Sequence, residues 1–271
     1  MNNYVANEAI IYPVFVLGTL TYLIIVFCNL LVLATIAVSK TLHKPMFILL
    51  FNLPISDVLG STAFFPHLLF SIVTQNRVIS QSACITQAFL IHFYGSGNML
   101  ILSAMAYDRY IAICCPLRYN AIMSPKNVIR IIILIWFLNF SMMTNVVDLI
   151  NNYFGMLSIV LLMGGPLLMI IYTYAQILRT CVMTNQTDAR KKAFQTCGTH
   201  LVIFLILQIN TIFTLIAHRI QSASPYIRRL LGISVLLFPP FLDPIIYGLK
   251  IKELKQRIEM FLKGNIFSTK L

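Results

Sequence analysis

Charge is scarce in this sequence. Only 10% of its 271 residues are charged, and 8 of them are acidic. A soluble domain usually carries about 25% charged residues, so this chain cannot cover a folded core with a polar surface. Because 59% of its residues are hydrophobic, lipid must be its main solvent. No paired Asp-Asp, His-Glu or Ser-His spacing is present, so we expect a membrane protein that is not an enzyme.

Domain boundaries are also absent. No linker, repeat or low-complexity tract interrupts the chain, and residues 1–271 are predicted to form one domain. A net charge of +12 would indicate nucleic-acid binding in a soluble protein. No run mixes Lys, Arg and aromatic residues, so no nucleic-acid partner is expected. The first residues lack a basic n-region, and the apolar run after them lacks a small-residue cleavage site, which predicts a retained first helix.

Seven stretches are long and apolar enough to cross a bilayer, which takes roughly 20 residues. They are Ile11–Val38, Pro45–Val73, Ile85–Ile113, Asn127–Val147, Met156–Thr180, Phe194–Ile220 and Leu230–Leu249. Of the 20 Lys and Arg residues, 16 fall on one side of these spans and four on the other. Basic residues mark the cytoplasmic side, so an odd number of spans predicts an extracellular amino terminus. The predicted fold class is an all-α bundle of seven transmembrane helices.

The segment after the last span, Lys250–Lys263, combines apolar and basic residues at helical spacing. The apolar residues are Ile251, Leu254, Ile258 and Phe261, and the basic ones among them are Lys252, Lys255 and Arg257. This pattern predicts an amphipathic helix on the inner leaflet. A basic patch attracted to anionic lipid would place the segment there equally well. Both interpretations make membrane lipid a partner.

Four motifs occur in order along the chain. They are LHKPMF at Leu42–Phe47, MAYDRYIAIC at Met105–Cys114 with its continuation PLRY at Pro116–Tyr119, KAFQTCGTHL at Lys192–Leu201, and PPFLDPIIYG at Pro239–Gly248. Together they resemble the odorant (olfactory) receptors of the rhodopsin-like G-protein-coupled receptor family, and the resemblance covers nearly the whole chain. Gly248-Leu249-Lys250 after the last motif resembles the fish-type members. Ile91 stands where amine receptors carry an aspartate, which argues against an amine receptor.

The resemblance implies a receptor that couples a small-molecule odorant to a heterotrimeric G protein of the stimulatory olfactory type. At rest Asp108 holds Arg109, and on activation Arg109 is released toward Tyr174 and Tyr247. The implied switch and coupling residues also include Tyr110, Asp243, Pro244, Arg190, Lys191 and Lys192. Two alternatives stay open: Asp108 and Arg109 form an interfacial ion pair without a signalling role, and residues 190–192 form a lipid-facing basic patch.

The resemblance further implies a ligand pocket in the outer half of the bundle, between the third, fifth, sixth and seventh spans. The residues facing it by family position are Ile91, His92, Gly95, Ser96, Ser158, Leu162, Gln208, Thr211, Leu215 and Ile233. An apolar cavity with few hydrogen-bonding groups suits small organic odorants. Gln208 is the strongest single candidate because a buried amide needs partners, whereas a Ser or Thr often bonds only its own helix.

Asp57 and Asp243 are the only carboxylates deep in the predicted spans. With Asn29 and Asn98 they match positions that line the sodium pocket of rhodopsin-like receptors. Two carboxylates in a low dielectric cannot both stay ionised without a cation or a shared proton. Two explanations stay open: a bound Na⁺, which takes oxygen ligands, and a protonated, water-bridged cluster. No other cofactor is expected.

Cys84 is the only one of the six cysteines at the extracellular end of a predicted span. The resemblance implies a disulfide from this position to a long second extracellular loop. Here the stretch between the fourth and fifth spans, Asp148–Gly155, is short and has no cysteine. We therefore expect an internal block of the loop to be missing and Cys84 to be an unpaired extracellular thiol. The loss of about 2–4 kcal/mol from one disulfide predicts poor folding, with retention in the endoplasmic reticulum competing with delivery to the plasma membrane.

The shortened loop leaves other functions open. The chain is then either a signalling odorant receptor or a non-signalling remnant of one. A rhodopsin-like receptor outside olfaction is a further alternative. A transporter or channel is the least favoured, because the sequence has no inverted repeat and no polar stripe through several spans.

Overall fold

A computed structural model describes residues 2–76, 78–149, 153–183, 198, 201–214 and 224–263. Every regular element in these ranges is helical. The helices are α1 (Asn2–Val38), α2 (Pro45–Leu50), α3 (Asn52–Thr74), α4 (Gln81–Cys114), α5 (Tyr119–Ile122), α6 (Pro125–Leu149), α7 (Tyr153–Met183), α9 (Pro225–Lys250) and α10 (Lys252–Leu262), with short 3₁₀ turns at Lys40–Leu42 and Pro116–Arg118. A further helix covers Leu201–Thr214.

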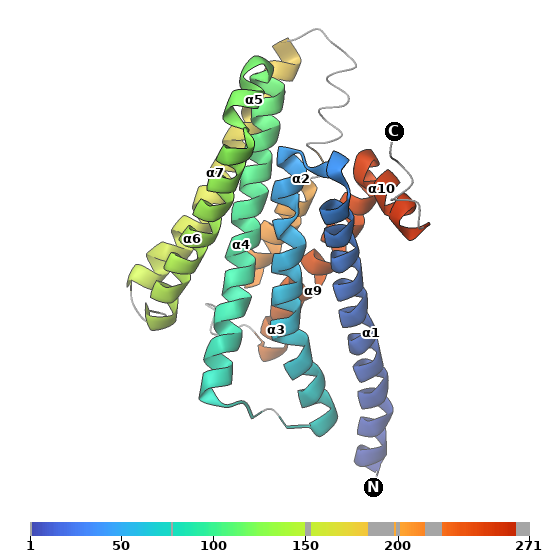
Figure 1. Ribbon diagram of the computed structural model, residues 1–271. Helices are drawn as coiled ribbons and strands as arrows, with labels where there is room; N and C mark the ends of the chain where they lie inside the picture. The colour runs from blue at the N-terminus through green and yellow to red at the C-terminus, as the bar shows by residue number, and fades with distance from the viewer. Residues whose placement is uncertain are drawn as a thin grey trace.

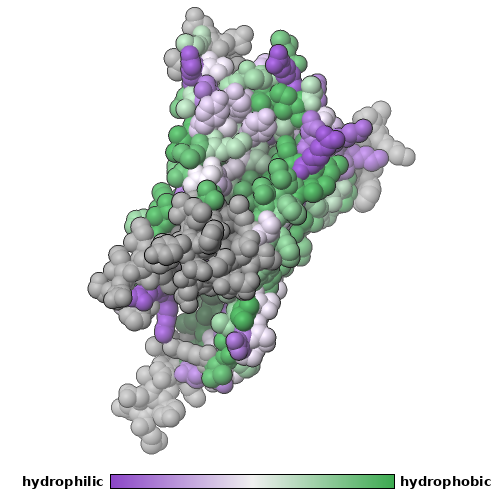
Figure 2. Space-filling view, turned by 90° about the vertical axis from the view of Figure 1, so that its left-hand side faces the viewer, coloured by the Kyte–Doolittle hydropathy of each residue, from purple (hydrophilic) through white to green (hydrophobic). Residues whose placement is uncertain are grey.

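The long helices run alternately up and down the bundle (Figure 1). Within the described ranges, four of them alone are long and apolar enough to cross a membrane: Ile11–Val38, Pro45–Thr74, Gln81–Cys114 and Tyr226–Lys250. Helix Pro125–Ser141 counts as a fifth crossing only together with Pro116–Ile122, from which it is bent by 67°. Figure 2 shows hydrophilic residues gathered toward the ends of the molecule, with a largely hydrophobic surface over the described residues between them. This distribution suits a chain surrounded by lipid.

One connection differs from the sequence expectation. The second predicted span is present, because the backbone stays helical at Phe51 between α2 and α3 and Pro45–Thr74 forms one span. The side-chain amide of Asn52 donates to the carbonyls of Ile48 and Leu49, at 2.9 and 3.4 Å. The predicted loop at Asp148–Gly155 is shorter than expected, because α6 continues to Leu149 and α7 already begins at Tyr153. A helix satisfies its own backbone groups, so it extends past the apolar run that the sequence shows.

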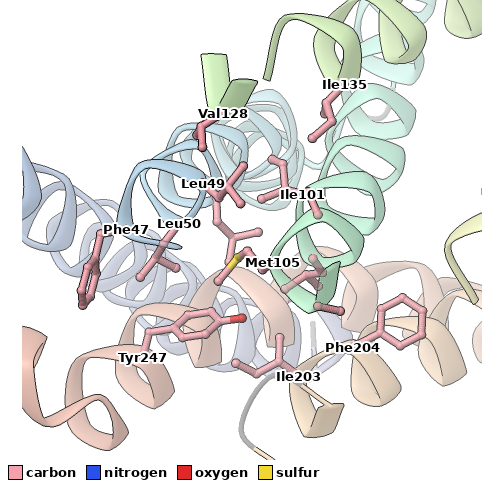
Figure 3. Packing of buried hydrophobic residues seen from close by; sticks show 14 of the residues in the cluster. Phe47, Leu49, Leu50, Ile101, Met105, Val128, Ile135, Ile203, Phe204 and Tyr247 are labelled. Carbon is pink, nitrogen blue, oxygen red and sulfur yellow. The ribbon is translucent and has the colours of Figure 1, made fainter. Parts of the chain in front are cut away.

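Helix α4 occupies the centre of the bundle and packs against α3, α6 and α7. Its inner face contributes Ile101 and Met105 to a buried cluster that also contains Phe47, Phe204 and Tyr247. Figure 3 shows the Tyr247 ring pointing into this cluster from α9. The core therefore lies in the half of the bundle that also carries the Asp-Arg pair.

The amphipathic tail helix is present as predicted. Leu254 of α10 is fully buried, and a Cβ added to Gly248 of α9 would lie 3.3 Å from the Ile258 side chain. Lys252 and Lys255 are exposed on the other face. An ion pair from Lys44 to Glu253, 2.5 Å long, joins the first connection to α10. Both of its side chains are partly exposed, so this pair positions α10 more than it stabilises the fold.

Replacing Gly60 by Ala should lower the melting temperature of the purified receptor by several degrees. A Cβ at Gly60 would lie 2.4 Å from Cγ and 2.9 Å from Cβ of the buried Tyr94. Rotation of the Tyr94 side chain about its χ angles leaves its Cβ in place, so it cannot fully relieve this clash. Overpacking of this kind costs about 1–3 kcal/mol. Gly95→Ala is the matched control, because a Cβ there would meet nothing within 4 Å. Equal melting temperatures for the two variants would contradict the close approach of α3 to Tyr94.

Candidate functional site

The Asp-Arg pair lies at the end of α4 that is opposite the amino terminus, beside α5 (Figure 1). Asp108 is fully buried. Its Oδ2 accepts from Arg109 Nε at 2.9 Å and also from the Nη2 of the same guanidinium. Its Oδ1 accepts from the hydroxyl of Tyr119 at 2.9 Å. Each carboxylate oxygen thus has a charged or polar partner, as a buried charge requires.

Tyr119 is a member of this site to which the sequence analysis gave no role. It belongs to α5, and the turn at Pro116–Arg118 brings it back beside α4. Burial, followed by the adjacent Asp108 carboxylate, raises the pKa of the Tyr119 phenol. The phenol therefore stays protonated and remains a donor to Asp108. The signal in the sequence was the PLRY continuation, but spacing alone did not identify which side chain would reach the carboxylate.

Three of the other predicted switch residues, Tyr247, Tyr174 and Tyr110, lie in or against one buried cluster. Tyr247 is buried in the main cluster, and Tyr174 packs against that cluster. Tyr110 also lies toward Tyr172 of α7, with ring centroids 6.1 Å apart. Arg190, Lys191 and Lys192 lie outside the described residues.

Asp57, Asn98, Asn29 and Asp243 are all buried. They come from four helices, α3, α4, α1 and α9. Asn98 Nδ2 donates to Asp57 Oδ1 at 2.7 Å. Among the described groups, their remaining side-chain oxygens have no hydrogen-bond donor: Asn29 Oδ1, Asp57 Oδ2, Asn98 Oδ1 and both oxygens of Asp243. A set of buried oxygens without donors suits a hard cation such as Na⁺.

Prolines in α9 create part of this environment. Pro244 has no N–H to bond the carbonyl of Pro240, four residues earlier, and Asn29 Nδ2 donates to that carbonyl at 2.9 Å. Pro239 likewise has no N–H to bond the carbonyl of Val235. The Tyr94 hydroxyl donates to that carbonyl at 3.4 Å. Side chains of α1 and α4 therefore complete the hydrogen bonding of α9.

A second polar network lies between α4 and α6 and was missed by the sequence analysis. Asn139 is fully buried. Its Nδ2 donates to the Phe93 carbonyl at 2.9 Å, and its Oδ1 accepts from Ser96 Oγ at 2.5 Å. Trp136, one turn earlier, donates from Nε1 to Asn52 Oδ1 at 3.0 Å. The hydroxyl of Ser96, predicted to face the ligand, is thus used in packing against α6.

The remaining predicted ligand residues divide into four groups. Gln208 is buried, and its Oε1 has no donor among the described groups, which leaves it available to a ligand. Thr211 donates to the Leu207 carbonyl of its own helix at 2.8 Å. Open space adjoins Gly95, His92 is exposed, and Ile91 and Ile233 are half-buried. Ser158 and Leu162 lie on α7 with side chains outside the described part of the chain, and Leu215 lies outside it altogether.

Cys84 lies in the first turn of α4, at the end of the helix opposite Arg109. Ser80 caps this end by accepting from the Ala83 amide at 3.3 Å. The Cys84 thiol is exposed and forms no disulfide within the described ranges. Cys84 and the Asp-Arg pair therefore lie at opposite ends of α4.

The arrangement of helices matches that of a solved seven-helix membrane protein. The crystal structure of squid rhodopsin matches with a TM-score of 0.79, covering 97% of this chain and 88% of that chain at 16% sequence identity. Identity this low supports the fold alone. The predicted fold class, an all-α bundle of seven transmembrane helices, is confirmed.

Sequence comparison gives the family. Residues 28–147 match the profile described as 7 transmembrane receptor (rhodopsin family), and residues 145–264 match the profile described as Olfactory receptor. Olfactory receptor 52B2 of Homo sapiens is 30% identical, covering 88% of this chain and 84% of the relative. Olfactory receptor-like protein OLF3 of Canis lupus familiaris is 32% identical, covering 89% and 86%. The chain belongs to the olfactory receptor family of rhodopsin-like G-protein-coupled receptors, a family of multi-pass membrane proteins.

Proposed function

We propose that this receptor converts binding of a small organic odorant into activation of a heterotrimeric G protein of the stimulatory olfactory type. The observation that carries the proposal is the buried Asp108 with Arg109 and Tyr119 at the carboxyl-terminal end of α4. The Asp108 carboxylate can exist in a held state, bonded to Arg109 and Tyr119, and in a released state in which Arg109 has moved away. The ion pair without a signalling role is the competing explanation.

The cytoplasmic surface beside this pair supports a protein partner. Leu117 is 100% exposed, and it lies between Arg109 and Tyr119 on the chain. Arg118 next to it is also exposed. An exposed leucine beside an exposed arginine offers an apolar and a charged contact to a docked protein. A G protein seated on Leu117 would press on the same turn that holds Tyr119 against Asp108.

The odorant site lies in the outer half of the bundle, with Gln208 as its polar contact. Gln208 is buried and its Oε1 has no donor among the described groups, and Ile91 and Ile233 of the predicted lining are apolar. One buried amide in an apolar setting favours a mainly hydrocarbon ligand with a single donor group. Alcohols are the simplest class that meets this description.

Asn29, Asp57, Asn98 and Asp243 would hold a Na⁺ ion in the resting receptor. The ion would supply positive charge that lets both carboxylates remain ionised in a low-dielectric site. The five oxygens without donors are the support for this assignment. The protonated, water-bridged cluster is the alternative, and the experiment that separates them is given in the Discussion.

We place the receptor in the plasma membrane with its amino terminus outside. The charge asymmetry of the loops supports this orientation, and α5 and α10 both lie in the half of the molecule away from the amino terminus (Figure 1). A fish-type origin within the family is supported by Gly248-Leu249-Lys250. No catalytic role is proposed, because the family consists of receptors.

The shortened second extracellular loop is part of the proposal. The match to one family profile ends at residue 147 and the match to the other begins at residue 145, beside the junction inferred from the sequence. Helices α6 and α7 are separated by only residues 150–152. A chain without the usual loop and its disulfide is expected to reach the surface poorly, which is why a non-signalling remnant is the second candidate.

Measurement of cyclic AMP in cells tests the proposal. Two epitope-tagged forms are expressed with a stimulatory olfactory G protein: this chain, and one with a full-length family loop inserted between Val147 and Asp148. Surface labelling should be several-fold higher for the second form, and a panel of alcohols should raise cyclic AMP in cells that display either form. Equal display would reject the folding defect. Absence of any response from well-displayed receptor would favour the remnant, and a ligand-evoked current without a G protein would favour a channel.

Replacing Tyr119 by Phe should raise ligand-independent cyclic AMP about tenfold, because a hydrogen bond to a charged group contributes about 1.5–3 kcal/mol and its loss destabilises the held state of Asp108. The exposed Tyr226 provides the control variant Tyr226→Phe, which should leave basal signalling unchanged. Basal values are compared at equal surface expression. A Tyr119→Phe receptor with wild-type basal activity would show that α5 does not participate in the switch.

A further inference from the structure

A groove opens on the surface of the bundle where α4, α6 and α7 meet. It has a volume of about 210 Å³ and is formed by Leu100 and Ser103 of α4, Leu138 of α6, and Gly165, Pro166 and Met169 of α7. None of these is among the residues predicted to face the odorant. The lining of the groove therefore differs from the set of residues predicted for the odorant pocket.

The groove faces the hydrocarbon of the bilayer. Pro166 lies near the middle of α7, whose ends are Tyr153 and Met183. At its rim, Leu161 and Met169 are 53% and 39% exposed, and the adjacent Leu168 is 68% exposed. In a membrane-spanning helix these apolar side chains contact lipid tails. Polar headgroups lie outside the roughly 30 Å hydrocarbon core, so they cannot reach a groove at the middle of a membrane-spanning helix.

The lining offers nothing for a polar ligand to bond. Its only hydroxyl belongs to Ser103, which already donates to the Met99 carbonyl at 2.8 Å. No unsatisfied buried side-chain atom occurs among the described lining residues. Gly165 contributes no side chain, and a Cβ added there would meet no atom within 4 Å. The hollow exists because small residues of α7 adjoin the larger side chains of α4 and α6.

We propose that this groove binds one hydrocarbon tail of a membrane lipid. An apolar cavity of about 150 Å³ is large enough for benzene, so the groove has room for a segment of several methylene groups. A tail seated there fills the space beside Pro166 and becomes part of the packing between α4 and α7. Bilayer lipid is the committed occupant because it surrounds the opening at all times.

Photolabelling in lipid nanodiscs tests this proposal. The discs contain phosphatidylcholine with a diazirine at the middle of one tail, and labelled residues are located by mass spectrometry. Met169 should be labelled several-fold more than Leu17 and Leu23, which are exposed apolar residues of α1. Gly165→Leu should reduce the labelling of Met169 to the level of α1, and Gly165→Ala should reduce it partly.

Gly164→Leu is the matched control. A Cβ at Gly164 also meets no atom within 4 Å, but Gly164 does not line the groove, so its labelling should equal that of the wild type. Labelling of α1 in every variant reports insertion and folding. The proposal is overturned if Met169 is labelled no more than α1 in the wild type, or if the two leucine variants change its labelling equally.

Discussion

Replacing Arg109 by Ala should abolish odorant-evoked cyclic AMP while leaving the receptor at the cell surface. Arg109 is the cationic partner of a fully buried carboxylate, and the proposed active state needs its guanidinium released toward the G protein. A hydrogen bond to a charged group contributes about 1.5–3 kcal/mol, so losing the contact of the released guanidinium corresponds to a loss of coupling of roughly 10-fold or more. The measurement is the ligand concentration response at matched surface expression.

The companion variant Asp108→Asn should act in the opposite direction. It keeps the shape of the side chain and its acceptor for Tyr119, but it removes the charge that holds Arg109, so basal cyclic AMP should rise. Arg130→Ala is the control, since Arg130 is exposed and its recorded hydrogen bond is a 3.4 Å contact to Asn127 one turn away. Wild-type coupling in the Arg109→Ala receptor would establish the ion pair as merely interfacial.

Sodium should raise the melting temperature of the purified receptor relative to choline at equal ionic strength, and Asp57→Asn should remove that difference. A bound ion stabilises by about 2.7 kcal/mol at a concentration 100 times its dissociation constant, and 1 kcal/mol corresponds to about 2–4 °C for a chain near this size. Asn at position 57 can still accept from Asn98. The variant therefore changes charge while keeping the 2.7 Å hydrogen bond.

Ser61→Ala serves as the control for this experiment. The Ser61 hydroxyl donates to the backbone carbonyl of Asp57 at 2.5 Å and contributes no oxygen to the cluster, so the sodium effect should persist. If the wild type melts at the same temperature in sodium and in choline, the buried carboxylates are held by a shared proton and water. Either outcome decides between the two explanations that the sequence left open.

Much of the fold could be predicted from the sequence because the bilayer imposes it. Helix α1 ends at Val38 and α9 ends one residue beyond the predicted Leu249, since the apolar runs must be helical to satisfy their backbone in lipid. The extension of α6 to Leu149 was not visible in hydropathy, because Asp148 interrupts the apolar run there.

The candidate site was predicted in part. Asp108 and Arg109 are adjacent in the sequence, so their pairing required no knowledge of the fold. Tyr119 reaches Asp108 across the turn at Pro116, and Asn139 reaches Ser96 from another helix. These contacts depend on how helices rotate about their axes. A spacing of 11 or 43 residues carries no such information.

The prolines of α9 have a consequence for biogenesis. A transmembrane helix is usually able to insert alone, since its backbone needs no partner. The carbonyls of Val235 and Pro240 instead receive donors from Tyr94 and Asn29, which the ribosome makes much earlier. The donors Asn29 and Tyr94 are therefore already in the bilayer when the last span inserts. Fragments that lack the first or third span should leave the carbonyls of Pro240 or Val235 without a donor, and such fragments should be degraded.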